Sequence, residues 1–243
     1  MRKFLDVMKG IEDKSIDMIL CDLPYGMTAC DWDVRIPFEP LWEAYKRIIK
    51  DNGAIVLTGS QPFTSELVMS NREWFKYELI WDKYIISGFL NANKMPLRVH
   101  ENILIFYGQQ PIYNPQKIKG NQNHSMGYNK KTNTNVYGKF ELQDNKDMLK
   151  NLKHPKSIID ISKQHPSKNI HPTQKPVALF EYLIKTYTNE GDLVLDNCIG
   201  SGTTAVACIK TNRHYIGIEL SQAYCDIANK RIEAEKQQLT MVI

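Results

Sequence analysis

The sequence predicts an α/β fold with a mixed, mostly parallel sheet and helices on both faces. Short apolar runs typical of strands buried on both faces, such as residues 15–21 and 54–58, alternate with stretches of helical periodicity. A glycine-rich turn at residues 200–202 separates a further apolar run from another helical stretch, an arrangement typical of Rossmann-like sheets. The length of 243 residues, with 42% hydrophobic and 24% charged residues, suits a single domain spanning 1–243.

The first half of the chain supplies most of the sheet. The expected elements are, in order, a helical lead-in before residue 15, a strand at 15–21, a loop at 26–37, a helix at 38–50, a strand at 54–58, a helix at 62–69, and strands at 77–81 and 102–107. Asp51-Asn52-Gly53 supplies a stop after the second helical stretch. Because no helix separates the last two strands, they should form a hairpin that ends an otherwise parallel sheet.

Residues 109–169 interrupt this pattern. Asparagine, lysine, histidine and glycine dominate there, and no window sustains a period, so we expect an insertion in the domain. Regular elements then return, as a helix at 177–188, a strand at 193–196, a helix at 205–210, a strand at 214–219 and a last helix after Ser221.

Charge is concentrated in the same region. Residues 112–175 hold twelve lysines, no arginine and four acids, a net charge of +8, against +4 for the whole chain. Such clustering is typical of a polyanion partner, and a solvated loop would explain it equally well.

Other compositional features exclude several classes of protein. The five cysteines have neither C-x-x-C spacing nor histidine partners, so we expect neither structural zinc nor disulfides. No apolar stretch is long enough to span a membrane, and no signal peptide follows Met1. We therefore expect a cytoplasmic protein without a membrane partner.

The first candidate site follows the strand at 15–21. The tetrapeptide D-L-P-Y at residues 22–25 places a carboxylate, a proline and an aromatic ring on a turn at the carboxyl end of a strand, where open α/β sheets bind ligands. An acceptor beside a flat ring can hold a planar group that carries an amine. A turn with Tyr25 packed in the core is an equally good reading of these four residues alone.

Three motifs resemble one family. D-L-P-Y is similar to the D-P-P-Y motif of the DNA amino-methyltransferases, which methylate the exocyclic nitrogen of adenine or cytosine, with Leu23 in place of the first proline. H-P-T-Q-K-P at residues 171–176 matches another motif of that family in full. Residues 196–204 resemble its S-adenosylmethionine loop, D-P-F-x-G-S-G-T-T, with Asn197 and Cys198 replacing Pro and Phe. The catalytic motif precedes the cofactor motif, a circularly permuted order that resembles the β group of the family and implies a methyltransferase fold.

The candidate cofactor site is a strand, a glycine turn, a helix and a strand ending in Glu219, an acid placed to hold ribose hydroxyls. It is not a P-loop, and it lacks the third glycine of the NAD pattern. Thr203 or Thr204 is expected to cap the helix and to add donors for a ligand carboxylate. The resemblance implies that S-adenosylmethionine is the cofactor and that these residues bind it: Asp22, Thr173, Lys175, Asp196, Gly200, Ser201, Gly202, Thr203, Thr204 and Glu219.

The resemblance also implies the chemistry. Asp22 and the carbonyl of Pro24 would accept hydrogen bonds from the two N–H groups of the amine, and Tyr25 would stack on the base. The base must leave the duplex to reach them. No metal is required. An aspartate at the first motif position resembles the adenine-N6 enzymes, so adenine in DNA is favoured. The alternatives are cytosine-N4 or RNA methylation, and a catalytically silent DNA-binding subunit of a modification complex.

DNA contact is expected in the target-recognition insertion at 109–169. Lysines and amides interleaved with aromatic residues can bind phosphates and read base edges. The candidates are Lys130, Lys131, Asn133, Asn135, Tyr137, Lys139 and Lys153. The sequence leaves open whether the chain forms a homodimer.

Overall fold

The computed structural model describes residues 2–28, 30, 33–121, 133–134, 138–139, 151–162 and 174–240. The chain divides into two compact units, Met1–Asn114 with Ser157–Ile243, and Pro115–Lys156. The first unit holds the described helices and a seven-stranded sheet, and the second holds two short pairs of strands. Residues 115–156 fall within the expected insertion.

The sheet of the first unit has the order β11-β10-β1-β2-β4-β3-β9. Its strands are β1 (Ile16–Cys21), β2 (Ile49–Gly59), β3 (Phe75–Ser87), β4 (Arg98–Phe106), β9 (Ile158–Asp160), β10 (Leu193–Asp196) and β11 (His214–Gly217). Strand β4 runs antiparallel to β2 and β3, and the other pairs are parallel. The mixed, mostly parallel sheet and its hairpin were both predicted, and both are confirmed.

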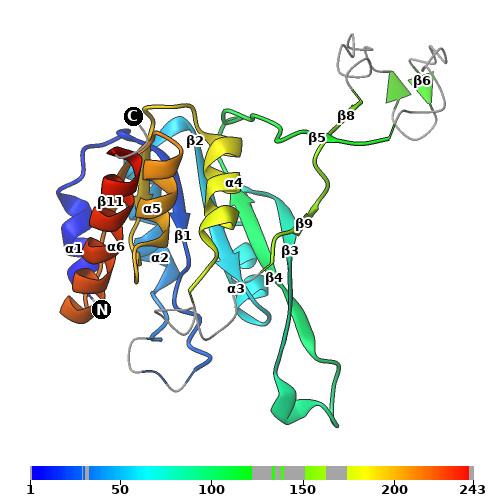
Figure 1. The fold of residues 1–243 in the computed structure, drawn as a ribbon, viewed down its shortest axis with the longest axis horizontal. Helices are drawn as coiled ribbons and strands as arrows, with labels where there is room; N and C mark the ends of the chain where they lie inside the picture. Colours follow the sequence, from blue (N-terminus) through cyan, green and yellow to red (C-terminus); the bar gives the residue numbers. More distant parts are fainter. Residues whose placement is uncertain are drawn as a thin grey trace. The chain divides into compact units, whose positions relative to one another are not determined.

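Helices cover both faces of the sheet (Figure 1). One core cluster joins the sheet to α1 (Arg2–Lys9), α2 (Phe38–Ile48) and α3 (Phe63–Ser70). The other joins it to α4 (Val177–Tyr187) and α5 (Thr203–Lys210). The last helix, α6 (Gln222–Thr240), lies beside α5. Within the part of the chain that the structure describes, no helix is long and apolar enough to cross a membrane.

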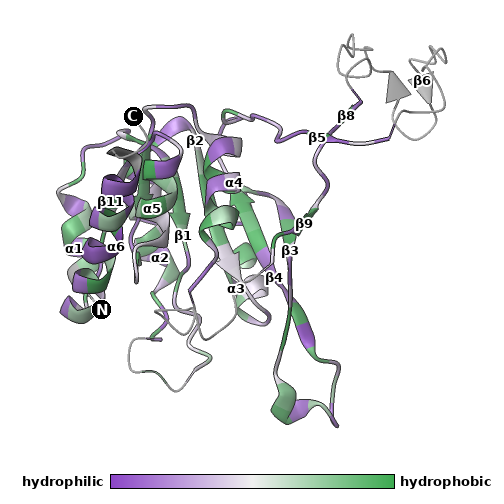
Figure 2. Cartoon of the chain, viewed as in Figure 1, coloured by the Kyte–Doolittle hydropathy of each residue, from purple (hydrophilic) through white to green (hydrophobic). Residues whose placement is uncertain are grey.

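The central strands are buried on both faces because their side chains alternate between the two clusters. In β1, Ile19 and Cys21 pack into the first cluster, whereas Met18 and Leu20 pack into the second. Both faces of such a strand must be apolar, which is why β1 reads as a continuous hydrophobic run rather than as an alternating one. Figure 2 shows the central strands in the hydrophobic colour.

Two details differ from the prediction. The stop at Asp51-Asn52-Gly53 lies inside β2, which already begins at Ile49. The pairing with β1 shifts there, so these polar residues form an irregularity rather than a break. Strand β9 was not expected at all, because three residues are too few to show a period, yet it pairs with β3 and buries Ile159.

The second unit holds β5 (Ile118–Lys119) paired with β8 (Leu152–Lys153), and β6 (Asn133–Thr134) paired with β7 (Gly138–Lys139). All four strands have two residues each. Such short strands carry no hydrophobic period, which explains why the sequence indicates no elements in this region.

Candidate active site and cofactor pocket

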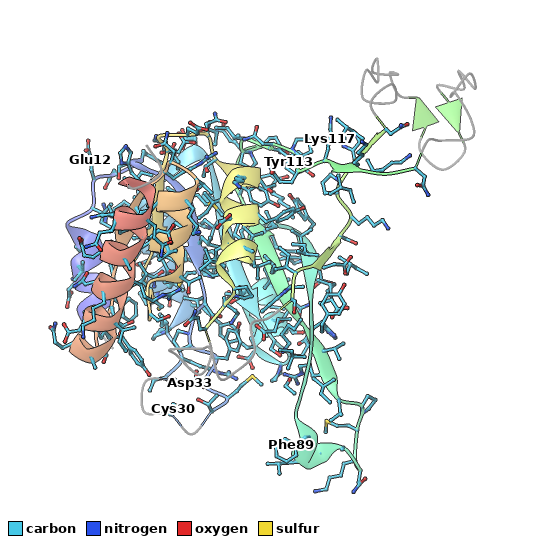
Figure 3. All side chains as sticks on the ribbon, viewed as in Figure 1. Glu12, Cys30, Asp33, Phe89, Tyr113 and Lys117 are labelled. Carbon is cyan, nitrogen blue, oxygen red and sulfur yellow. The ribbon has the colours of Figure 1, made fainter. Side chains whose placement is uncertain are left out.

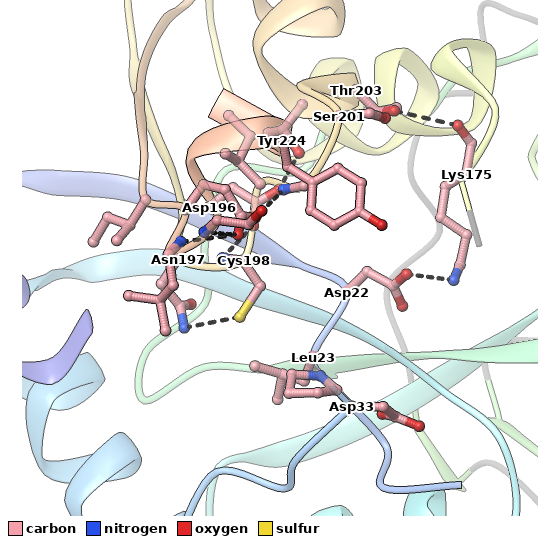
Figure 4. Close-up of a pocket in the computed structure, with 18 of the residues that line it drawn as sticks. Asp22, Leu23, Asp33, Lys175, Asp196, Asn197, Cys198, Ser201, Thr203 and Tyr224 are labelled. Carbon is pink, nitrogen blue, oxygen red and sulfur yellow. Dashed lines mark hydrogen bonds and ion pairs between the residues drawn. The ribbon is translucent and has the colours of Figure 1, made fainter. Parts of the chain in front are cut away.

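A pocket of about 650 Å³ lies at the carboxyl ends of β1, β10 and β11 (Figure 4). Segments that are far apart in the chain line it, among them the turn after β1, the glycine loop after β10 and the residues after β11. The parallel pairing of β1 with β10 and of β10 with β11 brings these strand ends together. The candidate catalytic and cofactor motifs therefore share one cavity.

The carboxylate of Asp22 is held through both oxygens. Its Oδ1 accepts hydrogen bonds from the hydroxyls of Thr58 and of Tyr25, the latter at 2.9 Å. Its Oδ2 accepts a hydrogen bond of 2.6 Å from Lys175 Nζ. A carboxylate oxygen has about two acceptor sites, so Oδ1 is filled and Oδ2 retains one. Asp22 is thus oriented with one acceptor position open.

Lys175 belongs to a chain of alternating charges at the wall of the pocket. Its Nζ lies 3.2 Å from Glu101 Oε2, and Glu101 Oε1 lies 3.1 Å from Lys83 Nζ. Burial opposes the charge on Glu101, but the ammonium groups of Lys175 and Lys83 outweigh it and lower the pKa of Glu101 to about 2. Burial likewise opposes the charge on Lys175, whereas Asp22 and Glu101 raise the pKa of Lys175 well above its usual range. Glu101 and Lys175 therefore both remain charged near neutral pH.

The ring of Tyr25 stacks on Phe63, with ring centroids 4.9 Å apart. Burial, together with the charge of Asp22, raises the pKa of the Tyr25 hydroxyl well above its usual value, so this group stays a neutral donor. Neighbouring Leu23 is 3% exposed and packs in the first core cluster. The leucine that departs from the family motif is thus a core residue, and the chemical groups at Asp22, Pro24 and Tyr25 are retained.

Asp33 holds the turn that follows this motif. Its Oδ1 accepts a hydrogen bond from the Gly26 amide at 2.8 Å, and its Oδ2 accepts those of Met27 and Thr28 at 2.8 and 2.7 Å. Although burial acts in the opposite direction, these amides lower the pKa of Asp33. The aspartate thus fixes the backbone of residues 26–28, and both Thr28 and Asp33 line the pocket.

The glycine loop needs its glycines for two reasons. Gly200 and Gly202 both adopt positive φ, of 52° and 84°, a region in which other residues are strained. A Cβ on Gly202 would also lie 3.0 Å from the Cβ of Ala228. The predicted helix cap is wrong: Gly202 is the cap residue of α5, and no side chain caps that helix. Thr204 instead donates its hydroxyl hydrogen bond to Asp196 Oδ2.

Two acids stand on either side of this loop. Glu219 Oε2 accepts a hydrogen bond from the Gly200 amide at 2.9 Å, and its Oε1 accepts those of Leu220 and Ser221 at 2.8 and 2.9 Å. Burial raises the pKa of Asp196 to about 6, although the hydroxyl of Thr204 favours the ionised form. Glu219 Oε2 keeps an acceptor site for a ligand hydroxyl.

Most of the predicted site residues that the structure describes line this one pocket. They are Asp22, Pro24, Tyr25, Lys175, Asp196, Gly200, Ser201, Thr203, Thr204 and Glu219. Gly202 belongs to the same loop without lining the pocket, and the hydroxyl of Ser201 accepts a hydrogen bond of 2.9 Å from Arg231.

Of the remaining candidates, the structure describes one side chain. Lys153 is in β8 of the second unit. Outside the described residues are Thr173, Lys130, Lys131, Asn135 and Tyr137, together with the side chains of Asn133 and Lys139.

Sequence reasoning missed Thr58 and Glu101, which both take part in holding the charged groups of the pocket. Thr58 carries a signal, since a hydroxyl at the end of a buried strand lies at the ligand-binding edge. Glu101 is an acid at the start of an apolar strand, which indicates a buried partner without saying which residue it is.

Comparison with known proteins agrees with this geometry. A sequence model of N6/N4 DNA methylases matches residues 16–230. The chain belongs to this family of DNA amino-methyltransferases. Like its family, it depends on S-adenosylmethionine. Among the residues placed by the structure, no cluster of histidine, cysteine and acidic side chains could hold a metal ion.

Several DNA methyltransferases are similar to this protein over nearly its whole length. The type II methyltransferase M.HpaI of Haemophilus parainfluenzae is 28% identical, over 95% of this chain and 72% of its own length. The orphan methyltransferase M.BamHII of Bacillus amyloliquefaciens is 31% identical, over 93% of this chain and 91% of its own. The crystal structure of the M1.HpyAVI-SAM complex has 25% identity, a TM-score of 0.61, and coverage of 94% and 95% of the two chains. The cytosine-N4-specific PvuII DNA methyltransferase, at 15% identity, shares the fold with a TM-score of 0.67, over 93% of this chain and 83% of its own.

Proposed function

We propose that this DNA methyltransferase transfers a methyl group from S-adenosylmethionine to the exocyclic N6 amine of an adenine flipped out of DNA. The observation that carries the proposal is the shared cavity, in which Asp22, Pro24 and Tyr25 lie with the glycine loop and Glu219. The choice of adenine rests on the aspartate at the first position of the catalytic motif.

The residues present fit the cofactor. The pocket volume of about 650 Å³ lies within the usual range of small-molecule sites. The amino end of α5 opens on the pocket through Thr203 and Thr204, and a helix amino end favours a carboxylate. Glu219 Oε2 is an acceptor for a ribose hydroxyl, and the acids around the pocket favour a positively charged ligand. When bound, the cofactor supplies an electrophilic methyl group on a sulfonium.

The protein groups prepare the amine. Its lone pair is delocalised into the base, so the nitrogen must become tetrahedral before it can form a bond to carbon. The amine would donate one hydrogen bond to the open acceptor site of Asp22 Oδ2 and one to the carbonyl of Pro24. These two hydrogen bonds would direct its lone pair at the methyl group. As the N–C bond forms and the S–C bond breaks, the surplus proton leaves the amine to solvent. Hydrogen bonds from Lys175, Thr58 and Tyr25 hold the carboxylate of Asp22 in its orientation throughout.

We also propose that residues 109–169 contact the DNA. Lysines there would bind phosphates, and Asn133, Asn135 and Tyr137 would influence which sequences are methylated, since amides can pair with adenine edges in the major groove. The net charge of +8 over residues 112–175 supports this role.

The deciding experiment identifies the product. The protein would be expressed in cells that lack DNA methylation, their DNA hydrolysed to nucleosides, and the modified positions mapped. We expect N6-methyladenine at one short sequence. Finding N4-methylcytosine instead would show that cytosine, not adenine, is the target base. Unmodified DNA would favour the catalytically silent DNA-binding subunit.

Asp22→Ala tests the mechanism with the mapped sequence as substrate. Removing a positioned electrostatic group lowers a rate by about 10²-fold or more. The single-turnover rate should fall at least that far, while calorimetry shows cofactor affinity within a few-fold of the wild type. Asp22→Asn is the matched control, because it keeps the shape and one acceptor but not the charge, and we expect an intermediate rate. A near-normal rate in Asp22→Ala would refute the assignment.

A further inference from the structure

A hairpin arm extends β3 and β4 beyond the sheet. The two strands pair regularly as far as Asp82 and His100, and then only Ser87 pairs with Arg98. Gly88, with φ of 85°, and the 3₁₀ helix η1 (Phe89–Asn91) form the tip. Figure 1 shows this arm projecting from the sheet, away from the helices. Residues 84–98 are called the arm below.

The arm carries large apolar side chains that are exposed. The exposed fraction is 75% for Phe89 and 83% for Leu90 at the tip, and 60% for Tyr84, 56% for Ile86 and 57% for Met95 along it. Figure 2 shows the tip in the hydrophobic colour, and Figure 3 shows the side chain of Phe89 there. Single exposed apolar residues are ordinary, but a cluster at the end of an arm indicates a surface made for contact.

The charge of the arm indicates what that contact is. Lys94 and Arg98 are its charged residues, and residues 84–98 contain neither aspartate nor glutamate. Asp82 lies at the base of the arm, where its Oδ1 accepts a hydrogen bond from the Tyr84 amide at 2.9 Å. Beyond that point the net charge of the arm is positive and attracts a polyanion. It does not favour a second copy of itself, because two such arms would bring like charges together.

The arm also starts at the edge of the sheet where the pocket opens. Strand β4 is antiparallel to both β2 and β3, so β3 points the same way as β2 and β1, and its carboxyl end lies at the edge that bears Asp22. At the base of the arm, Lys83 contacts Glu101, which contacts Lys175 of the pocket. In Figure 3, Phe89 lies on the same side of the sheet as Asp33, which lines the pocket.

We propose that the arm is a wedge that opens the DNA duplex beside the target base. Phe89 and Leu90 insert into the base stack and occupy the space left when the base enters the pocket, while Lys94 and Arg98 contact the flanking phosphates. Proteins that kink or unstack DNA use apolar side chains in this way, and such contacts offset the free energy that unpairing and unstacking the flipped base cost. The inference rests on the proposed function, in which the target base leaves the duplex.

The test compares the double variant Phe89→Ala, Leu90→Ala with the wild type on three oligonucleotides that carry the mapped sequence: a full duplex, a duplex mismatched at the target base, and a single strand. We expect the single-turnover methylation rate to fall at least tenfold on the full duplex and less than threefold on the other two, with cofactor affinity unchanged. With 2-aminopurine at the target position, the fluorescence rise on binding duplex should be lost. Met69→Ala is the control, since Met69 is 68% exposed on α3, and it should behave as the wild type.

Equal rates for variant and wild type on the full duplex would overturn the wedge and leave the proposed methylation intact, as would an equal loss on all three substrates. A wild type that methylates no DNA would instead overturn the proposed function. Sedimentation of the same variants tests the alternative that the arm is an interface between two copies of the chain. If the wild type is a dimer and the double variant a monomer, the arm is such an interface and the wedge is wrong.

Discussion

Glu101→Gln is the substitution whose effect on stability can be worked out from the charges around it. The glutamate is 14% exposed and lies between two ammonium groups, those of Lys83 and Lys175. Glutamine keeps the shape of the side chain and removes the charge. Lys83 then loses its anionic partner in the pocket wall, and Lys175 keeps Asp22 alone.

The magnitude follows from the pKa. At about 1.4 kcal/mol per pKa unit, the shift of Glu101 from 4.5 to about 2 corresponds to about 3 kcal/mol. A carboxyl whose folded-state pKa is lowered contributes this stability above its unfolded pKa and loses it as the pH falls toward the folded value. The variant should therefore be about 3 kcal/mol less stable than the wild type at pH 7, and about 2 kcal/mol less stable at about pH 3.5.

Urea unfolding of the wild type and of Glu101→Gln at both pH values measures this difference as a change in the free energy of unfolding. Glu233→Gln is the control, because the ion pair of Glu233 with Lys236 is exposed and such pairs contribute at most about 1 kcal/mol. If Glu101→Gln were no more destabilising than this control at pH 7, or if its effect grew as the pH fell, the account of the charge chain would be refuted.

Three further predictions concern binding. Tyr25→Ala should weaken binding of the flipped base, read as a smaller fluorescence rise from 2-aminopurine at the target position, and an unchanged signal would count against stacking. Glu219→Ala removes charge-assisted hydrogen bonds worth about 1.5–3 kcal/mol each, so calorimetry should show the cofactor bound at least several-fold more weakly, and unaltered affinity would mean that the pocket is misassigned. Replacing four lysines by glutamine should weaken the salt dependence of DNA binding: the slope of log binding constant against log salt concentration should fall by close to one unit per lost phosphate contact. Cofactor affinity should be unchanged. An unchanged slope with full activity would show that the insertion is a solvated loop. These lysines are Lys130, Lys131, Lys139 and Lys153.

Much of this protein can be predicted from its sequence because the signals are local. The strands around β1 are continuous apolar runs, since each is buried on both faces, and the helices show their own period. The tetrapeptide at 22–25 and the glycine loop at 200–202 are each contiguous, so their chemistry can be recognised without knowing what lies next to them. The placement of both motifs at strand ends also follows from the order of elements, because parallel strands meet at one edge.

Only the tertiary structure decided which side chains meet. Lys175 is 153 positions along the chain from Asp22, and nothing in either motif indicates that its ammonium binds that carboxylate or that Glu101 completes the charge chain. The hydroxyl of Thr204 is likewise directed to Asp196 rather than to the end of its own helix. Hydrogen bonds and ion pairs act over a few ångströms and are indifferent to separation along the chain, so a local pattern can name the groups of a site but not their partners. The exposure of Phe89 at the tip of the arm was also decided by the fold, because the sequence does not show whether an apolar side chain in a loop is covered by another part of the protein.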